Sequence, residues 1–262
     1  MSAVPDFALP APHRLPVLTS SSSRYALEFA ATPEDLDQTF LLRYRVFNLE
    51  LEEGLEASHE TGRDVDRFDA HCHHLLVRDR ASGAVVGTYR LQTGDMAAAG
   101  CGFYSASEFE LGAMPADVLA ASAEIGRACI AREHRNLRVL YLLWQGLGQY
   151  LAFNQLRYLF GCCSLTSQDP HEATRVFERL RRQDGLHRAF LIPALESHRC
   201  LLDHPEPGGD HIPRLMSAYL SLGARICSEP AIDREFRTVD YLALFDLEAL
   251  EPARLAFFTC PS

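Results

Sequence analysis

The chain has 262 residues, of which 47% are hydrophobic and 23% are charged, and its formal net charge is −10. This composition is typical of a globular protein, and the length is enough to bury a sizeable core. A surface that binds nucleic acid is normally basic, so the negative charge argues against a nucleic-acid partner. We therefore expect a globular protein whose partners are not nucleic acids.

The cationic residues are unusual because all 25 are arginine and none is lysine. The base composition of the source genome is the ordinary explanation. Local clusters of arginine still matter, because the planar guanidinium group binds phosphate and carboxylate through two parallel hydrogen bonds.

The eight cysteines do not form a recognisable zinc or disulfide pattern. Several lie in apolar segments, which is typical of buried, reduced thiols in a cytoplasmic protein. Cys72 with His71, His73 and His74 is the only cluster that suggests a metal. It lies where a strand is expected to start, and alternate side chains of a strand point to opposite faces. We therefore expect no metal site.

Membrane insertion is also not expected. The first residues are rich in proline and lack the basic and apolar parts of a signal peptide. The apolar stretch near Leu137–Phe153 is interrupted by Arg138, Gln145 and Gln149, so it reads as a buried helix. We expect a cytoplasmic protein that at most contacts the inner membrane peripherally.

The predicted elements begin after a flexible tail, residues 1–23, which contains four prolines and a serine run. Tyr25–Ala30 alternates like a strand. Thr32-Pro33-Glu34 then supplies a helix N-cap, a proline at the first helical position and an acid in the first turn. The acidic, glycine-containing segment Glu50–Asp64 reads as a mobile loop.

The rest of the pattern alternates strands with helices. Expected strands are His74–Asp79, Ala84–Gln92, Ser122–Ala131, Arg157–Leu165, Ala224–Ser228 and Tyr241–Phe245. Expected helices are Asn136–Asn154, Pro170–Arg182 and Pro213–Leu222. The order matches the acetyltransferase-like (GNAT) α/β fold: a mixed central sheet flanked by helices. We expect one such domain over residues 24–262, with the break at Asp203–Asp210 as an insertion.

A set of polar and aromatic residues gives the chain a more specific resemblance. In this order and spacing it resembles the acyl-carrier-protein-dependent N-acyltransferases: the ornithine N-alpha-acyltransferase and hemolysin-like family, related to the acyl-homoserine-lactone synthases. The residues that carry the resemblance are Arg43, Phe47, Asp66, Asp69, Arg90, Phe103, Glu124 and Arg127.

The resemblance implies a catalytic role for Glu124 and Arg127. Three residues apart on a strand, they would face opposite sides unless a bulge intervenes, so an ordinary structural ion pair is the alternative. In this fold the thioester carbonyl lies where the central strand separates from its neighbour. A glutamate there accepts the amine proton, directly or through water. Backbone N–H groups of the strand can bind the oxyanion, and Gly126 permits close approach.

Asp66, Asp69, Arg43 and Arg90 are expected to form a charge network that binds the acceptor. An amino-acid acceptor carries both signs of charge, and so does this set. A solvated turn ahead of a strand is the alternative reading for the aspartates. Whether they contact the substrate or only order the loop stays open.

The donor side of the site is indicated by two further features. The resemblance makes Phe47 and Phe103 apolar walls of the pocket, although ordinary core packing would also explain them. Coenzyme-A-using members of this fold bind a pyrophosphate at a glycine-rich turn before the long helix. Here that turn has no glycine but has Arg132, Arg135 and Arg138. This favours the single phosphate of acyl carrier protein, although a solvated face is the alternative.

A covalent mechanism through a cysteine is not favoured. Cys129 lies near Glu124 and His134 follows, but spacing alone gives no Cys-His pair. An amine can attack an activated thioester without an acyl-enzyme. We therefore expect no bound cofactor, with acyl-phosphopantetheine as the donor substrate.

The resemblance thus implies transfer of a fatty, 3-hydroxylated acyl chain from acyl carrier protein to the α-amine of L-ornithine, which gives lyso-ornithine lipid. The alternatives are another amino-acid acceptor, S-adenosylmethionine as in signal synthesis, or a non-catalytic hemolysin-like membrane protein. Homoserine-lactone synthases usually carry a Trp soon after the phenylalanine of the first helix. Here the only Trp is Trp144, on the long helix, which counts against a signal synthase.

Overall fold

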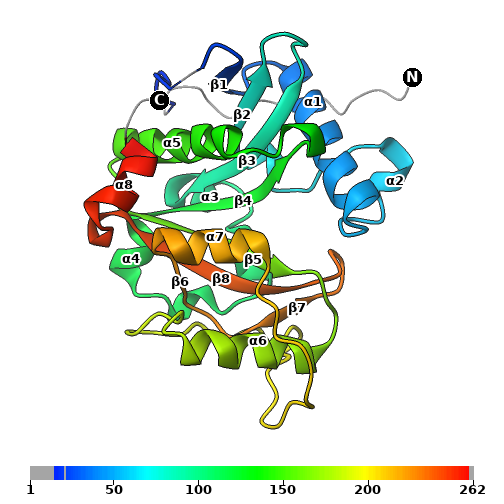
Figure 1. Ribbon diagram of the computed structural model, residues 1–262, viewed down its shortest axis with the longest axis vertical. Coiled ribbons are helices and arrows are strands. Elements are labelled where there is room, and N and C mark those ends of the chain that lie inside the picture. Colours follow the sequence, from blue (N-terminus) through cyan, green and yellow to red (C-terminus); the bar gives the residue numbers. More distant parts are fainter. Residues whose placement is uncertain (1–14, 21, 260–262) are drawn as a thin grey trace.

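A mixed β-sheet of eight strands forms the centre of the computed structural model, which describes residues 15–20 and 22–259 (Figure 1). Most of the predicted 1–23 tail lies outside the described residues. The strand order is β1-β2-β3-β4-β5-β8-β6, and β7 pairs with β8. The strands are β1 (Tyr25–Phe29), β2 (His73–Asp79), β3 (Val85–Thr93), β4 (Ser122–Ile130), β5 (Tyr158–Leu165), β6 (Arg225–Ile226), β7 (Ala231–Asp233) and β8 (Thr238–Asp246).

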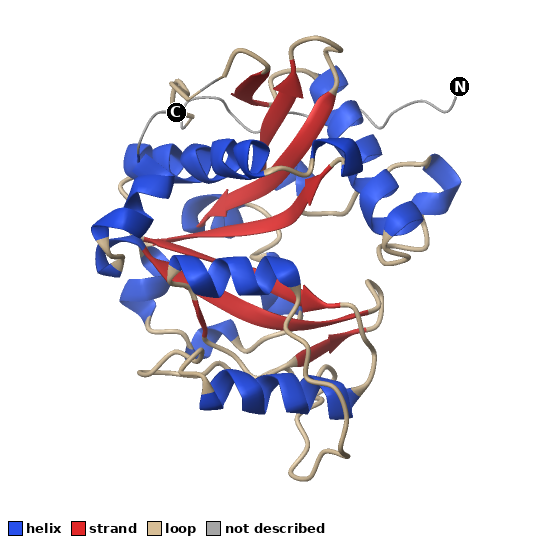
Figure 2. Cartoon of the chain, viewed as in Figure 1, coloured by secondary structure: helices blue, strands red, loops and turns tan. Residues whose placement is uncertain are grey.

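Helices cover the sheet and fill its connections (Figure 2). They are α1 (Pro33–Tyr44), α2 (Ser58–Thr61), α3 (Gly94–Ala99), α4 (Ala116–Ala120), α5 (Leu137–Asn154), α6 (Pro170–Arg182), α7 (Arg214–Leu222) and α8 (Pro252–Thr259). A π-helical segment, η2 (Arg45–Glu50), continues α1. The short 3-10 turns are η3 (Asp69–His71), η4 (Tyr104–Ser107), η5 (Leu111–Ala113), η6 (Arg132–His134) and η7 (Leu247–Ala249).

The first half of the sheet, β1 to β4, is buried on both faces. Leu75 and Val77 of β2 belong to the large core cluster that also contains the apolar side of α5. Leu76 points to the opposite face, where it packs with Phe40 of α1. Alternate residues of β2 therefore meet different helices, as the two-residue period of a strand requires.

The second half, β5 to β8, is covered differently on its two faces. The amphipathic helices α6 and α7 pack their apolar sides on one face, through residues such as Phe177 and Met216. A separate apolar cluster that includes Phe109 and Phe160 covers the other face. It is built from the segment between β3 and β4 together with Ile192 and Ala194, and therefore closes this half of the sheet without a long helix.

The two halves meet at β4 and β5, which pair in parallel, unlike the other strand pairs of the described residues, and these strands soon separate. Their ladder joins Ser122 through Glu124 to Tyr158 through Phe160 and goes no further. Gly161 lies at the point of separation, where an added Cβ would come within 2.0 Å of the backbone oxygen of Ile125. A side chain is therefore not tolerated where the strands are still in contact, and beyond this point a gap opens.

The predicted α/β architecture with a mixed sheet is confirmed, and most element bounds agree within one or two residues. Three differences matter. The segment Glu50–Asp64 contains α2 and ends in a buried aspartate, so it is not a featureless loop. The first helix ends in a π-helical segment. Finally, β8 is longer than the predicted Tyr241–Phe245 because it begins at Thr238.

Candidate active site

A cavity of about 200 Å³ lies in the gap between β4 and β5. Four of the predicted site residues line it, namely Phe47, Arg90, Glu124 and Arg127. Gly126 also lines it, and an added Cβ there would meet no heavy atom within 4 Å. The strand therefore presents open space at this glycine, which is where a ligand could approach the backbone.

A β-bulge brings Glu124 and Arg127 to the same cavity. Arg90 of β3 pairs with Gly126, but Thr88 pairs with Cys129, so β4 carries an extra residue between these pairs. Arg127 has a φ of 50°, in the left-handed region that non-glycine residues rarely occupy. Bulges redirect side chains in this way beside active sites. On a regular strand, residues three apart would face opposite sides, and the bulge is what allows Glu124 and Arg127 to face the same side.

Glu124 is buried and is held by the segment that follows Phe103. Its Oε2 accepts the backbone N–H of Tyr104 at 2.8 Å. Its Oε1 accepts the backbone N–H and the hydroxyl of Ser105, at 2.8 and 2.5 Å. Burial raises the pKa of Glu124, although these hydrogen bonds oppose the rise. The carboxylate is therefore oriented and is more basic than an exposed glutamate.

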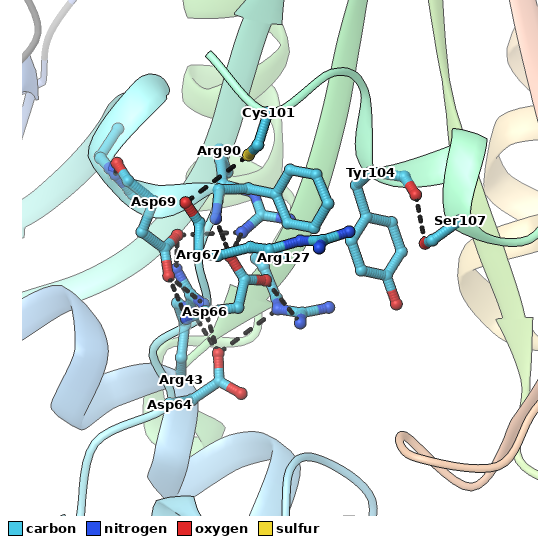
Figure 3. Close-up of polar contacts among 12 residues, drawn as sticks. Arg43, Asp64, Asp66, Arg67, Asp69, Arg90, Cys101, Tyr104, Ser107 and Arg127 are labelled. Atoms are coloured by element: carbon cyan, nitrogen blue, oxygen red, sulfur yellow. Dashed lines mark hydrogen bonds and ion pairs between the residues drawn. The ribbon is translucent and has the colours of Figure 1, made fainter. Parts of the chain in front are cut away.

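The expected charge network is present (Figure 3), and two of its arginines, Arg90 and Arg127, line the cavity. Arg43 of α1 donates to Asp69 through Nη1 at 2.7 Å and Nη2 at 3.1 Å. Arg90 of β3 donates to Asp66 at 2.6 Å and to Asp69 at 3.0 Å. Arg127 joins the network through Asp66 at 2.9 Å. The loop that carries both aspartates is thus tied to α1, β3 and β4.

Asp64 belongs to the same network, although the sequence reasoning missed it. It accepts the Nε–H of Arg43 at 2.6 Å and lies 3.4 Å from Nε of Arg127. It was assigned to the end of a mobile loop. The available signal was the pattern Asp64-x-Asp66-x-x-Asp69, because three aspartates are needed to balance the three arginines.

The oxygens of Asp69 are already occupied by the protein. Oδ1 accepts from Arg43 and Arg90, and Oδ2 accepts from Arg43 and the backbone N–H of Asp66. Burial favours protonation, but the two arginines outweigh it and hold the pKa of Asp69 far below its usual value. For Asp66 the same balance, with Arg90 and Arg127, also lowers the pKa. The network is an internal ion cluster, and Asp69 has no free acceptor to offer a substrate.

The two predicted aromatic walls lie in different places. Phe47 lines the cavity and packs edge-on against Phe236, with the ring centroids 5.4 Å apart. Phe103 instead packs against Phe160, 5.1 Å between centroids, on the edge of the second apolar cluster. Phe103 is therefore not a wall of this cavity, because the chain turns at Gly102 and places Tyr104 there instead.

A second, mostly apolar cavity of about 430 Å³ has one of the three predicted donor arginines, Arg135, in its lining, whereas Arg132 lines a separate cavity. The mostly apolar cavity adjoins the first, since Phe47, Leu51, Ala128 and Leu215 line both. Arg135 lines this second cavity and is paired with Glu50. Arg132 and Arg138 are exposed on the same turn and helix start.

Comparison with known proteins agrees with this geometry. Residues 42–145 match the family described as Acetyltransferase (GNAT) domain. The chain is 30% identical over 249 residues to the L-ornithine N(alpha)-acyltransferase of Rhizobium meliloti (strain 1021), covering 87% of this chain and 82% of that protein. It is 31% identical over 233 residues to the enzyme of the same name from Brucella abortus (strain 2308), with 83% and 82% covered.

This chain belongs to the L-ornithine N(alpha)-acyltransferase family. Among solved structures, the AHL synthase LasI superposes with a TM-score of 0.50 at 12% identity, covering 92% of this chain and 99% of that one. At that identity the likeness shows the fold alone. The predicted family and its GNAT-like fold are confirmed.

For an acyltransferase of this family, the other candidate centres are less suitable. Burial raises the pKa of the Cys129 thiol to about 12, and His134 is paired with the hydroxyl of Tyr25 instead. His73 and His74 contact Tyr150 and the backbone of Asp69, in separate directions. Among the residues that the structure describes, Cys129 and His134 do not form a nucleophilic pair, and the side chains around Cys72 do not converge on one point.

The helices of this family member are not long and apolar enough to cross a bilayer. This holds for every helix within residues 15–20 and 22–259, including α5 with 18 residues.

Proposed function

We propose that this protein transfers a fatty, 3-hydroxylated acyl chain from acyl carrier protein to the α-amine of L-ornithine. One observation supports this above all. Glu124 lies oriented and buried in the gap between β4 and β5, in a chain that belongs to the L-ornithine N(alpha)-acyltransferase family. The product is lyso-ornithine lipid, and the reaction needs no bound cofactor because the acyl group is already activated as a thioester.

The reaction begins with the amine. Glu124, directly or through water, takes the proton from the attacking ammonium group, and its raised pKa suits this task near neutral pH. The amine then attacks the thioester carbonyl carbon beside Gly126. The carbon–sulfur bond breaks, and the thiol of phosphopantetheine leaves with a proton.

Arg127 and the backbone of β4 stabilise the charge that develops on the carbonyl oxygen. Beyond Glu124 the edge of β4 that faces β5 has left the parallel ladder. Backbone N–H groups on that edge can donate to an oxyanion, and the open space at Gly126 lets the carbonyl come close. Arg127 and Arg90 also offer positive charge to the carboxylate of the acceptor.

Asp64, Asp66 and Asp69 hold Arg43, Arg90 and Arg127 in place. Since Asp69 has no free acceptor, we assign Asp69 a positioning role, and its neighbours Asp64 and Asp66 the same role through their arginines. Of the two roles that the sequence left open for Asp66 and Asp69, the proposal takes the ordering of the loop.

Acyl carrier protein approaches from the side of Arg132, Arg135 and Arg138. These arginines are suited to the phosphate of phosphopantetheine and to the acidic surface of a carrier protein. Arg214, at the start of α7, lines the same apolar cavity and is exposed. The arm and acyl chain then occupy the apolar cavity, with the thioester at its junction with the polar one.

Residues 24–262 form the catalytic domain in this proposal. Residues 15–20 of the predicted tail are not loose, because Leu15 and Leu18 pack against the core and Thr19 donates its backbone N–H to Gln149 of α5. The acyl chain of the product is apolar, so we expect the protein to contact the inner membrane peripherally from the cytoplasm.

Mass spectrometry of lipid extracts tests the proposal. Cells that lack ornithine lipids, expressing this protein with excess ornithine, should accumulate N-acyl-ornithine, and cells expressing Glu124→Gln should not. Accumulation of a different N-acyl amino acid, without the ornithine product, would contradict the acceptor assignment.

A further inference from the structure

Two buried carboxylates next to the active-site cavity have no cation to neutralise them. Glu108 is 2% exposed and Asp240 is 3% exposed. Three atoms lie within 4.8 Å of one another: a carboxylate oxygen of Glu108, a carboxylate oxygen of Asp240 and Sγ of Cys162. Asp240 and Cys162 line the cavity that contains Glu124. Asp240 is therefore in reach of a ligand in that cavity, and Glu108, which does not line the cavity, lies close to Asp240.

The oxygens of this pair are only partly satisfied by the protein. Among the described residues, none donates a hydrogen bond of normal geometry to either oxygen of Glu108 or to Oδ1 of Asp240. The side chains of Ser164 and Thr238 lower the pKa of Asp240, and that of Tyr104 lowers the pKa of Glu108, but burial outweighs them. The neighbouring Asp233 differs, because it accepts the Tyr104 hydroxyl at 3.0 Å and two backbone N–H groups at 2.8 Å. A buried carboxylate without donors is costly, so these atoms indicate a missing partner.

A positively charged partner would have to come from outside the described chain. The sequence contains no lysine, and Arg90 and Arg127, the arginines of the cavity, pair with the aspartates of the network. Burial raises the pKa of Asp240 to about 6. Burial and then the charge of Asp240 raise the pKa of Glu108 well above its usual value. Without a cation the pair thus retains a proton, which a bound cation would displace.

The position of the pair relative to Glu124 suggests which cation binds. Glu124 is on β4 and Asp240 is on β8, so they face the cavity from opposite sides of β5. Tyr104 connects the two regions, because its backbone N–H binds Glu124 and its hydroxyl binds Asp233. A molecule with two amino groups could therefore place one at Glu124 and the other at Asp240.

We propose that Glu108 and Asp240 bind the side-chain ammonium group of the acceptor amino acid. This rests on the proposed function, and it explains how the site selects an acceptor with a second amine on a short arm. The α-amine then meets Glu124, and the α-carboxylate lies toward Arg127. Selectivity follows because an acceptor that lacks the second amine leaves the buried acids unpaired.

A metal ion is the competing ligand for these residues, because one ligand atom each of Glu108, Asp240 and Cys162 lies within 4.8 Å of the others. A metal would have to displace the proton of the Cys162 thiol, whereas an ammonium group requires no change at the sulfur. Two carboxylates alone hold an ammonium group well, because it brings its own three N–H donors.

Steady-state kinetics with two acceptors tests the inference. Ornithine is compared with norvaline, which has the same carbon chain without the terminal amine. Wild-type protein, Glu108→Gln and Asp240→Asn are assayed, with Asp246→Asn of the same strand β8 as the matched control, because Asp246 pairs with Arg157 outside the cavity. Each test variant should lose about ten- to a hundredfold in kcat/KM for ornithine. Their kcat/KM for norvaline, and the control's for both acceptors, should be unchanged.

Several results would overturn the inference. If the variants lose activity equally with both acceptors, or lose no activity with either, the pair does not recognise the side-chain amine. The proposed function would still stand. Stimulation by added divalent metal and loss with a chelator would assign the pair to a metal. If wild-type protein acylates neither acceptor, the proposed function itself fails and the inference with it.

A measurement on wild-type protein covers the case in which the variants do not fold. Calorimetric titration in two buffers of different ionisation enthalpy should show more proton release when ornithine binds than when norvaline binds. Equal proton release with both acceptors, or none with either, would contradict the inference.

Discussion

Arg43 and Asp69 face each other through two parallel hydrogen bonds, and neither side chain has exposed surface. Arg43 lies in α1 and Asp69 begins the turn before β2, so the pair fixes the loop to the helix. Arg90 and Asp64 complete the neutralisation on either side. The pair therefore determines where the loop, and with it Arg127, can lie.

Removing one partner should reveal this role. Asp69→Asn leaves Arg43 and Arg90 buried with less compensating charge, so the free energy of unfolding should fall by about 3–5 kcal/mol. The measurement is denaturant or thermal unfolding. Asp37→Asn is the control, because its pair with Arg63 is partly exposed and should contribute at most about 1 kcal/mol. A stable Asp69→Asn protein with a raised KM for the acceptor alone would instead make Asp69 a substrate contact.

The acid pair should affect the dependence of stability on pH. Because the folded pKa of Asp240 is raised to about 6, the stability linked to its protonation is complete below an ordinary aspartate's pKa, about 4. It is lost as the pH rises through about 6. Asp240→Asn should remove this loss and raise the melting temperature at pH 8 by on the order of a few degrees. Identical pH profiles for the two proteins would contradict this.

Glu124 should act in the chemical step. Glu124→Gln is expected to lower kcat by roughly 10²–10⁴-fold. The acidic limb of the wild-type pH–rate profile should lie above the usual pKa of a glutamate, since burial raises the pKa of Glu124. The melting temperature is measured alongside, because the new amide must meet one of the N–H donors of Tyr104 and Ser105. A folded variant with the wild-type rate would remove Glu124 from the mechanism.

Substitution of two glycines at the gap between β4 and β5 should have different effects on activity and on stability. Gly126→Val points a side chain into open space, so the protein should stay folded but lose activity because the cavity is filled. Gly161→Ala places a Cβ against the backbone of Ile125, so the protein should be destabilised, by about 1–3 kcal/mol. Thermal unfolding and a rate assay on both variants separate the effects. An active Gly126→Val protein would place the reaction elsewhere.

The donor arginines should matter for one donor only. Replacing Arg132 and Arg138 by glutamate should raise the KM for acyl carrier protein at low salt and leave that for the matched acyl-coenzyme A nearly unchanged. Added salt should weaken use of the carrier protein by the wild type, because exposed charges are screened beyond about 10 Å at 0.1 M ionic strength. Equal use of both donors, independent of salt, would refute carrier-protein docking at this face.

Local patterns predicted much of the fold. The N-cap at Thr32 forms with both hydrogen bonds of a capping box, and α6 spans the residues expected from its periodicity. The start of β8 was less visible. Strand β8 begins at Thr238, but two of its first three residues are polar and so did not indicate a strand.

The parts of the site that the sequence did not predict depend on contacts between distant segments. The bulge at Arg127 appears only when β4 is paired with β3. Asp64 looks like a loop residue until α1 and β4 bring arginines to it. Glu108 and Asp240 are far apart in the sequence, and neither lies in a motif. Their proximity follows from the packing of the β3–β4 connection against β8.

Direct reconstitution tests the central claim. Purified protein is incubated with a 3-hydroxyacyl form of acyl carrier protein and L-ornithine, and the products are resolved by mass spectrometry. The account predicts N-acyl-ornithine with the acyl group on the α-nitrogen, together with free carrier-protein thiol in equal amount, and no product above background with Glu124→Gln. Acylation of the side-chain amine, or the same product yield from Glu124→Gln, would contradict it.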